Sequence, residues 1–392
     1  MTESWVRLPG RARHLAPAFA IPLLLAGTVA SIGPAGASAV APAAACRAWS
    51  GPPPPSPGTD DNELNGVAVL SPCDAWAVGD QHSGGVEQTL IEHWDGTAWT
   101  VVASPNVAGR DNQLNGVRAA SPTDIWAVGE SFSTGADQTL ILHWNGHTWT
   151  QVASPAPGTG AALNAVRTVS ATDVWAVGFF DNGTADVPLI LRWNGQKWAQ
   201  VASPHPGIEG VLSGVAVVSA TNAWAVGTFF NGSAERSLTL HWNGQKWAQV
   251  ASPNPGGSAR DTILNGIAAG TATGKVWAVG WYSKGAMDKT LILAWNGKAW
   301  VQQASPSPGS SFLFGAVTTA ADNTWAVGNY DNGATVLSLI LYWNGTKWAR
   351  VASPNPGSGN SLYAVAASSG SNVWAVGRFI GDIHETFAVH CC

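Results

Sequence analysis

The sequence predicts an all-β protein, a seven-bladed β-propeller of four-stranded antiparallel blades, from three observations. The tetrapeptide Trp-Ala-Val-Gly occurs seven times, and successive copies lie 50, 49, 49, 53, 48 and 49 residues apart. A period of about 50 residues is typical of a propeller blade and is too long for helical or leucine-rich repeats. With 45 glycines, 24 prolines and 22 tryptophans but only 11% charged residues, the composition favours short strands and tight turns. The copies begin at Trp76, Trp126, Trp175, Trp224, Trp277, Trp325 and Trp374.

The first unit shows how one blade divides into strands. Its apolar pattern predicts an innermost strand over 64–70, followed by strands over 75–78, 89–94 and 98–103, with a polar loop over 80–88. Asp95-Gly96, which becomes Asn-Gly in other units, predicts a two-residue type I′ hairpin between the last two strands. That turn would place Trp94 and Trp99 diagonally on one face. We expect nearly all the tryptophans to pack between blades.

The seventh unit lacks a fourth strand, because the chain ends soon after the third. A substitute stands at the other terminus: Trp49 precedes the first innermost strand by the same 15 residues that separate Trp99 from the second. We therefore expect residues 47–50 to complete the last blade, a closure that leaves no free sheet edge at the seam.

The four cysteines support this closure. Aligned on the first unit, Cys391 takes the place of a hairpin tryptophan and Cys46 that of a hairpin glycine, so the chain ends would meet where the other blades have a turn. We expect a disulfide of Cys46 with Cys391 or Cys392, in a compartment where disulfides persist. Cys73 either stays free or pairs with the remaining terminal cysteine.

The first 39 residues are predicted to be a secretory signal peptide. Three arginines precede an apolar run over 18–30, and Ala37-Ser38-Ala39 is a typical cleavage site. The run is too short to span a bilayer comfortably. The predicted organisation is a signal peptide, 1–39, and one propeller domain, 40–392, that is secreted or held at the cell surface by contacts. A lipoprotein modified at Cys46 is the alternative.

The charge pattern offers no electrostatic footprint for nucleic acid. The formal net charge is −5, and it becomes −7 when the signal peptide removes three arginines and one glutamate. No Gly-x-Ser-x-Gly stretch and no basic cluster beside a carboxylate pair occurs, so the sequence predicts neither catalytic residues nor a cofactor. Four histidines share one repeat position on separate blades, too far apart to bind one metal ion, and we expect no metal site. They are His93, His143, His241 and His390.

One face of the predicted ring varies while the other does not. The turn face, formed by the turns between strands one and two and by the hairpins, is nearly identical in all units. The loop face, formed by the loops between strands two and three and between blades, varies. Aromatic residues beside Asp and Asn on a rigid scaffold suit a carbohydrate or peptide site, whereas packing and turn formation are the alternative. The candidates are Phe132, Phe179, Asp181, Phe229, Asn231, Trp281, Tyr282, Tyr330 and Asp331.

Four asparagines near the start of the innermost strand form a second candidate set. We expect them to open this strand at the mouth of the central channel. Each could donate a hydrogen bond to a ligand or cap the backbone. They are Asn65, Asn115, Asn164 and Asn265.

The repeat contains Leu-Asn-Gly-Val, then Asp-x-Trp-Ala-Val-Gly, then Leu-Ile-x-x-Trp-Asn-Gly-x-x-Trp and Ala-Ser-Pro. Over 47–392 it resembles the tryptophan-rich repeats of proteins secreted by soil bacteria such as actinobacteria. It is similar, more loosely, to kelch and Asp-box propellers, but it lacks the paired glycines of the first and the arginine cluster of the second. The resemblance implies the fold, whereas these families include sugar-binding proteins, adaptors and enzymes alike.

Together these observations predict a secreted, monomeric, non-catalytic binding propeller whose loop face meets an extracellular glycan or protein. One alternative is an extracellular hydrolase or lyase with its site at the channel mouth, which a gathering of Asp, Glu, His or Arg near the axis would favour. Another is a purely structural envelope protein. We expect no membrane span and no nucleic-acid partner.

Overall fold

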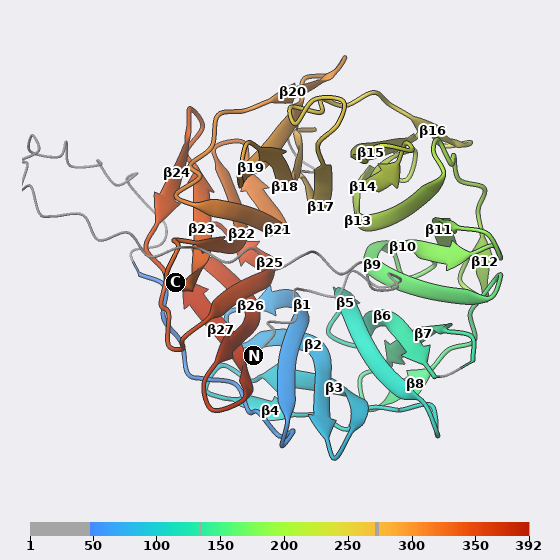
Figure 1. The fold of residues 1–392 in the computed structure, drawn as a ribbon. Helices are drawn as coiled ribbons and strands as arrows, with labels where there is room; N and C mark the ends of the chain where they lie inside the picture. The colour runs from blue at the N-terminus through green and yellow to red at the C-terminus, as the bar shows by residue number, and fades with distance from the viewer. Residues whose placement is uncertain (1–47, 134, 271–273, 392) are drawn as a thin grey trace, which may run out of the picture. The chain divides into compact units, whose positions relative to one another are not determined.

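The computed structural model describes residues 48–133, 135–270 and 274–391. They belong to one compact unit, Ala45–Cys392, in which seven antiparallel sheets form a ring (Figure 1). The innermost strand of each sheet contacts that of the next, and β25 (Asn360–Ser369) contacts β1 (Asp61–Ser71), so the ring is closed. This confirms the all-β, seven-bladed propeller. The predicted signal peptide, 1–39, lies outside the described residues and stays a prediction.

All blades share one antiparallel order, from the innermost strand outward. The first three comprise β1 (Asp61–Ser71), β2 (Asp74–Ser83), β3 (Val86–Trp94), β4 (Trp99–Val101); β5 (Asp111–Ser121), β6 (Asp124–Phe132), β7 (Gln138–Trp144), β8 (Trp149–Gln151); and β9 (Gly160–Ser170), β10 (Asp173–Asp181), β11 (Asp186–Trp193), β12 (Trp198–Gln200). The next three comprise β13 (Glu209–Ser219), β14 (Asn222–Phe230), β15 (Glu235–Trp242), β16 (Trp247–Gln249); β17 (Thr262–Ala269), β18 (Val276–Lys284), β19 (Met287–Trp295), β20 (Trp300–Gln302); and β21 (Ser310–Ala320), β22 (Asn323–Asp331), β23 (Val336–Trp343), β24 (Trp348–Val351). The last has β25 (Asn360–Ser369), β26 (Asn372–Ile380) and β27 (His384–Cys391). Within these ranges no helix occurs, and hence none that could cross a membrane.

Strands two and three are longer than the sequence predicts. The predicted polar loop over 80–88 is mostly strand, because β2 and β3 pair on both sides of a tight turn at Gly84-Gly85. Gly79 does not end the second strand but lies inside it. An added Cβ there would stand 1.9 Å from the carbonyl oxygen of Glu63, so this glycine is required by a close backbone approach.

The hairpin between strands three and four has four loop residues, not the predicted two. Trp94 pairs directly with Trp99, with ring centroids 5.8 Å apart, rather than lying diagonal to it. Asp95 Oδ1 accepts hydrogen bonds from the backbone N–H groups of Thr97 (2.8 Å) and Ala98 (3.0 Å). The Asn of the other hairpins does the same. The type I′ prediction was wrong because this side chain builds an Asx turn instead.

Tryptophans fill the junctions between blades, as predicted. The strand-two tryptophan of one blade contacts the strand-three and strand-four tryptophans of the next. The ring centroid of Trp126, for example, lies 5.1 Å from that of Trp193 and 5.3 Å from that of Trp198, the latter edge-on. Edge-on and tilted contacts are the favoured geometries of aromatic rings. The same triad recurs at Trp76, Trp175, Trp224, Trp277 and Trp374.

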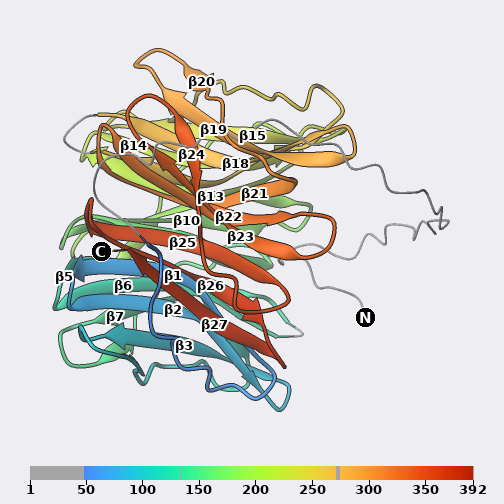
Figure 2. The same ribbon diagram turned by 90° about the vertical axis from the view of Figure 1, so that its left-hand side faces the viewer.

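N-terminal residues complete the last blade, which confirms the predicted closure. Ser50 and His390 exchange two backbone hydrogen bonds of 3.0 and 2.6 Å. Trp49 is buried and lies edge-on to Trp325 of the sixth blade at 5.2 Å, so it takes the strand-four position of the seventh junction. Figure 2 shows β26 and β27 beside β1, where the first and last blades meet.

The cysteine predictions are met only in part. Cys391 is buried at the end of β27, where the other blades have the strand-three tryptophan. Cys46 and Cys392 lie outside the described residues, so a disulfide joining the chain ends stays a prediction. Cys73 is exposed and free. It lies against Gly96 of the hairpin in the first blade, so of the two options the structure shows the free thiol.

Candidate functional site

On the loop face, each blade meets the next through two side-chain positions. One residue follows Trp-Ala-Val-Gly in the first blade, and the other precedes the buried leucine of the innermost strand in the second. We call these the junction pairs. Their chemistry changes around the ring, from ionic and polar to aromatic. The direct contacts are Asp80 with Gln113 at 3.1 Å, Asn329 with Ser361 at 2.7 Å, Arg378 with Glu63 at 2.9 Å, and Trp281 with Phe312 at 5.3 Å between ring centroids.

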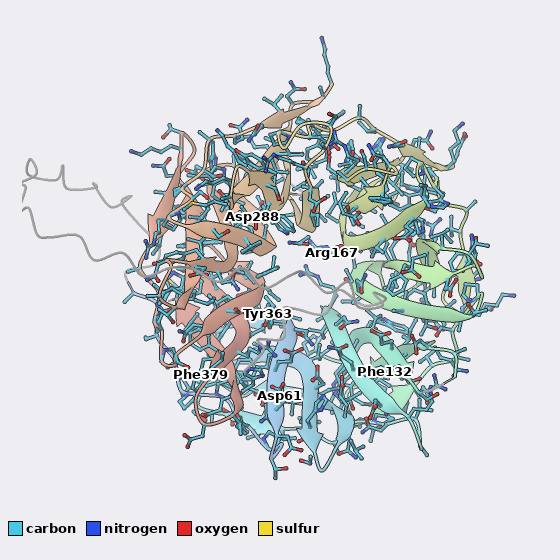
Figure 3. All side chains as sticks on the ribbon, in the orientation of Figure 1. Asp61, Phe132, Arg167, Asp288, Tyr363 and Phe379 are labelled. Carbon is cyan, nitrogen blue, oxygen red and sulfur yellow. The ribbon has the colours of Figure 1, made fainter. Side chains whose placement is uncertain are left out.

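Charged side chains gather at and beside the junction pairs of blades seven, one and two. We call this group the acidic sector. Figure 3 labels one of its members, Asp61, on the first blade. Its described members are five carboxyl groups, one arginine and two histidines, so acidic groups outnumber basic ones. The members are Asp61, Glu63, Asp80, Glu87, Glu130, Arg378, His82 and His384.

In one half of the acidic sector, Arg378 lies among carboxylates and a histidine, so positive and negative groups balance. Its Nη1 donates to Glu63 Oε2 at 2.9 Å and lies 3.2 Å from Nδ1 of His384, which is 2.8 Å from Asp61 Oδ2. Burial pushes the pKa of Asp61 upward, but the hydrogen bond and charge of His384 and the charge of Arg378 outweigh it, and this pKa is lowered. Asp61 is therefore held ionised within a network that joins blades one and seven.

In the other half of the acidic sector, Asp80 lies among other carboxyl groups. Its Oδ1 accepts hydrogen bonds from the side-chain amides of Asn65 (3.2 Å) and Gln113 (3.1 Å). Burial, together with the charges of Glu63 and Glu87, raises the pKa of Asp80 well above its usual range. A buried carboxylate beside two others is poorly solvated and is repelled by its neighbours, so an added cation would stabilise this half.

Asp80, His82 and Glu87 also form a group that could hold a metal ion. One ligand atom from each lies within 4.8 Å of the other two, and His82 Nε2 is 2.8 Å from Glu87 Oε2. Our expectation of no metal site rested on the recurring histidines of strand three. It did not cover His82, which lies in β2.

Glu130 extends the acidic sector to the second blade, where it takes the same repeat position as Asp80. Burial, and then the charge of Asp137, raise the pKa of Glu130 to about 7. Arg110 fixes the adjoining loop, with Nη2 donating to the carbonyl oxygen of Ser131 at 2.7 Å. Glu130 therefore changes its charge near neutral pH.

Sequence analysis missed the acidic sector because it sought charged residues at one repeat position. The sector joins two different positions across each junction, and Glu63 and Arg378 are 315 residues apart in the chain. Reading each repeat against its neighbour with this offset would have paired them. The structure thus brings together charged groups from the first three strands of adjacent blades, which equivalent repeat positions do not reveal.

Several aromatic candidates pack inside the blade junctions. Phe179 and Tyr330 are 5% and 4% exposed, and Phe229 and Tyr282 pack against the hydrophobic clusters between blades. The hydroxyl of Tyr330 accepts a hydrogen bond of 2.6 Å from Arg350. These contacts correspond to the packing alternative, and no continuous aromatic platform results. A ligand-binding role for these residues stays a prediction.

Two aromatic candidates remain partly accessible on the loop face. Trp281 is half-buried against Phe312, and Phe132 is half-buried at the end of β6. They belong to different blades, two and five, so the structure does not bring them together.

The polar loop candidates form turns. Asp181 Oδ1 accepts from the backbone N–H of Gly183 at 2.8 Å, and Asp331 Oδ1 does so from Gly333 at 2.7 Å. Asn231 Oδ1 accepts from Ser233 and Ala234. These are the Asx turns that the alternative interpretation described.

The four asparagines join blades rather than opening the innermost strand. Each sits at a β-bulge inside that strand and donates its Nδ2 to the carbonyl oxygen of the buried leucine in the next blade. The donor–acceptor distances are 3.2 Å for Asn65, 3.0 Å for Asn115, 2.8 Å for Asn164 and 2.9 Å for Asn265. The bulge position in blade seven is Tyr363, which Figure 3 labels near the ring centre.

The recurring histidines belong to the packed interior of their own blades. Each ring lies on the strand-two tryptophan, with centroids 4.2 to 4.4 Å apart, and its Nε2 contacts an Asp or Asn oxygen of the same blade. They are His93, His143, His241 and His390.

Fold and site together define a class: a seven-bladed propeller with a uniform turn face and a chemically uneven loop face. Among solved structures, "YCF48 bound to D1 peptide" is similar, with a TM-score of 0.56 and 16% identity over 89% of this chain and 98% of that chain. "YCF48 from Cyanidioschyzon merolae" has a TM-score of 0.53 and 15% identity over 88% and 98%. "Structure of U3-55K" has a TM-score of 0.56 and 11% identity over 89% and 99%. At these identities the likeness shows the fold alone.

No protein-family model matches the chain, and no curated protein matches it.

Proposed function

We propose that this chain is a secreted, non-catalytic binding propeller whose loop face binds a protein segment over the acidic sector. The observation that carries the proposal is the excess of carboxylates at Asp80, Glu87 and Glu130, on the variable face of a rigid ring. Variable loops on a rigid scaffold are the usual location of binding residues. A carboxylate cluster that the fold does not need for closure is therefore best explained by a partner.

The chemistry of the acidic sector selects a basic partner. Lysine or arginine side chains would neutralise the excess charge, steer association and lower the energy of the buried carboxylates. A protein segment is favoured over a glycan, because the aromatic side chains that would form a sugar platform are largely buried in the junctions. The structural neighbour solved with a peptide supports this use of the fold.

Secretion is part of the proposal and rests on the predicted signal peptide, 1–39, and on the predicted disulfide between Cys46 and a terminal cysteine. Mass spectrometry of the secreted protein would show a chain beginning near Val40. It would also show a non-reduced peptide pair containing Cys46. A retained leader or a free Cys46 thiol would remove this support.

A peptide array and a glycan array probed with the mature protein test the proposal. We expect retained peptides to be rich in Lys and Arg, retention to fall with added salt, and the glycan array to stay silent. Silence on both arrays, or selection of acidic peptides, would contradict the proposal. Retention of glycans alone would replace the protein partner with a sugar.

Two matched variants locate the binding surface. Glu87→Gln removes one carboxylate from the acidic sector but keeps an oxygen for His82 Nε2, which lies 2.8 Å from Glu87 Oε2. It should weaken binding of an array-selected peptide by about tenfold. Asp95→Asn removes one carboxylate from the turn face, where most other hairpins already have Asn, and should leave the affinity unchanged. Equal effects of the two variants would place the binding surface elsewhere.

A second candidate function, hydrolysis at the inner edge of the loop face, is favoured by one observation. Glu63 and Asp80 are cross-strand neighbours, one held by Arg378 and the other with a raised pKa. A carboxyl group whose pKa is raised by burial beside a second carboxylate is typical of a general acid in a carboxyl pair. Turnover of chromogenic glycosides or peptides that disappears in Asp80→Asn would support hydrolysis, and no turnover in the wild type would exclude it for those substrates.

A further inference from the structure

Two arginines on the innermost strands have no role in the fold or in the acidic sector. Arg118 on β5 and Arg167 on β9 take the same repeat position in adjacent blades, four residues after the buried leucine. At this one position, two adjacent blades therefore differ from the rest of the repeat, and both carry arginine. The other five blades have short residues at this position: Ala68, Ala216, Ala268, Val317 and Ala366.

Within the described ranges, no carboxylate pairs with either arginine. Neither guanidinium makes a hydrogen bond there, and Nε of Arg118 is buried with no acceptor. The contrast with other arginines is clear: Arg192 donates to both oxygens of Asp173 at 2.8 Å, and Arg378 donates to Glu63. Both side chains are half-buried, and a charge that is partly withdrawn from water without a counter-charge is unfavourable.

Each arginine also makes the other harder to accommodate. The positive charge of Arg118, followed by burial, lowers the pKa of Arg167 to about 9, and burial lowers the pKa of Arg118. Figure 3 labels Arg167 at the centre of the ring. The other five blades carry only Ala or Val at this position, so among the described residues only these two blades place a charged side chain there.

We propose that Arg118 and Arg167 form an oxyanion-binding site on the propeller axis, which accepts a phosphate, sulfate or carboxylate group. Guanidinium N–H groups match two oxygens of such an anion, and two arginines from neighbouring blades would bind it from two directions. The anion supplies the counter-charge that the described residues do not. This site is separate from the acidic sector, and it does not depend on the proposed function of the loop face.

Thermal unfolding of the mature protein in matched ionic strength tests the site. Sodium phosphate, sulfate and acetate are titrated against sodium chloride. We expect Tm to rise by a few degrees and to saturate with at least one oxyanion, since a ligand that binds only the folded state stabilises it by mass action. Phosphate and sulfate acting more strongly than acetate would assign a tetrahedral group, whereas acetate acting equally would assign a carboxylate.

Variants that restore the repeat provide the decisive comparison. Arg118→Ala, Arg167→Ala and their combination should unfold at the same or a higher Tm without oxyanion, because they remove half-buried charges that repel each other. They should lose the oxyanion-dependent rise. Arg236→Ala, which removes a half-buried arginine of β15 that donates to the carbonyl oxygen of Gly257, should keep it. The proposal fails if the wild type shows no saturable, oxyanion-specific rise or if the double variant retains one.

Discussion

The tryptophan junctions and the junction pairs of the loop face come from the same seven-fold repeat, yet they differ in how far the blades agree. In the tryptophan junctions, the strand-two indole meets the next blade in all seven cases, with Trp49 supplying the last contact. In the junction pairs, the same two positions hold an ionic pair, a hydrogen bond from a side-chain amide or an edge-on aromatic pair. Positions that do not vary close the ring, and positions that vary are free to carry a binding site.

Removing one tryptophan from each region should give the largest difference in the free energy of unfolding. Trp175→Ala deletes a fully buried indole and should destabilise the protein by about 3 to 5 kcal/mol. Trp281→Ala removes a half-buried side chain of the loop face and should have an effect of about 1 kcal/mol. Denaturant midpoints of both variants provide the measurement. Similar losses would mean that the loop face contributes to closure as much as the tryptophan junctions do.

Glu92 is an exception within the packed interior, because it places a carboxyl group where the other blades have an apolar side chain. It is fully buried between blades one and seven, its carboxylate oxygens make no hydrogen bond in the described structure, and burial raises its pKa to about 9. The unfolded chain releases this proton near pH 4.5 and the folded chain near 9, so stability should fall as pH rises between those values. The other blades have Leu142, Leu191, Leu240, Leu293, Leu341 and Val389 here.

Replacing Glu92 by leucine should therefore stabilise the protein. The raised pKa corresponds to about 3 kcal/mol at pH 7, and Glu92→Leu removes it. Unfolding followed at pH 5, 7 and 9 should show a stability gain that grows with pH. A loss of stability in Glu92→Leu at pH 7 would show that the carboxylate has a partner that the described residues do not supply.

The asparagine bonds between blades should have an intermediate effect. Asn115→Ala removes the bond from its Nδ2 to the carbonyl oxygen of Leu163 and should destabilise by about 1 kcal/mol. Ser213 takes this position in blade four without such a bond, so Ser213→Ala is the control and should stay within about 0.5 kcal/mol of the wild type. If both variants behave alike, the asparagines are free for a ligand, which is one of the two roles that the sequence left open.

The smallest expected effect is a pH dependence of peptide binding. Because the pKa of Glu130 is raised to about 7, lowering the pH from 8 to 6 protonates it and weakens the attraction for a basic segment. We expect the Kd of the array-selected peptide to rise by about twofold to fivefold. Glu130→Gln should flatten this dependence, and tighter binding at pH 6 would contradict the role assigned to this carboxyl.

The sequence predicts the uniform parts of this protein better than the variable ones. Seven blades, the packing of the tryptophans and the closure by Trp49 follow from periodicity, because each repeats a local pattern or completes one. The four-residue hairpin was missed because Asn-Gly serves both type I′ and Asx turns. The acidic sector and the pair of Arg118 and Arg167 were missed for another reason. They depend on which residues of adjacent blades meet, and this is set by the register of the innermost strands.

Hydrogen–deuterium exchange of the mature protein, free and bound to the array-selected peptide, tests the central claim most directly. Binding over the acidic sector predicts slower exchange in 59–63, 80–88, 130–138 and 378–386, with no change at the turn-face hairpins such as 95–98 and 145–148. Protection of the hairpins, or a bound peptide that leaves the acidic sector unprotected, would contradict the assignment of binding to the loop face.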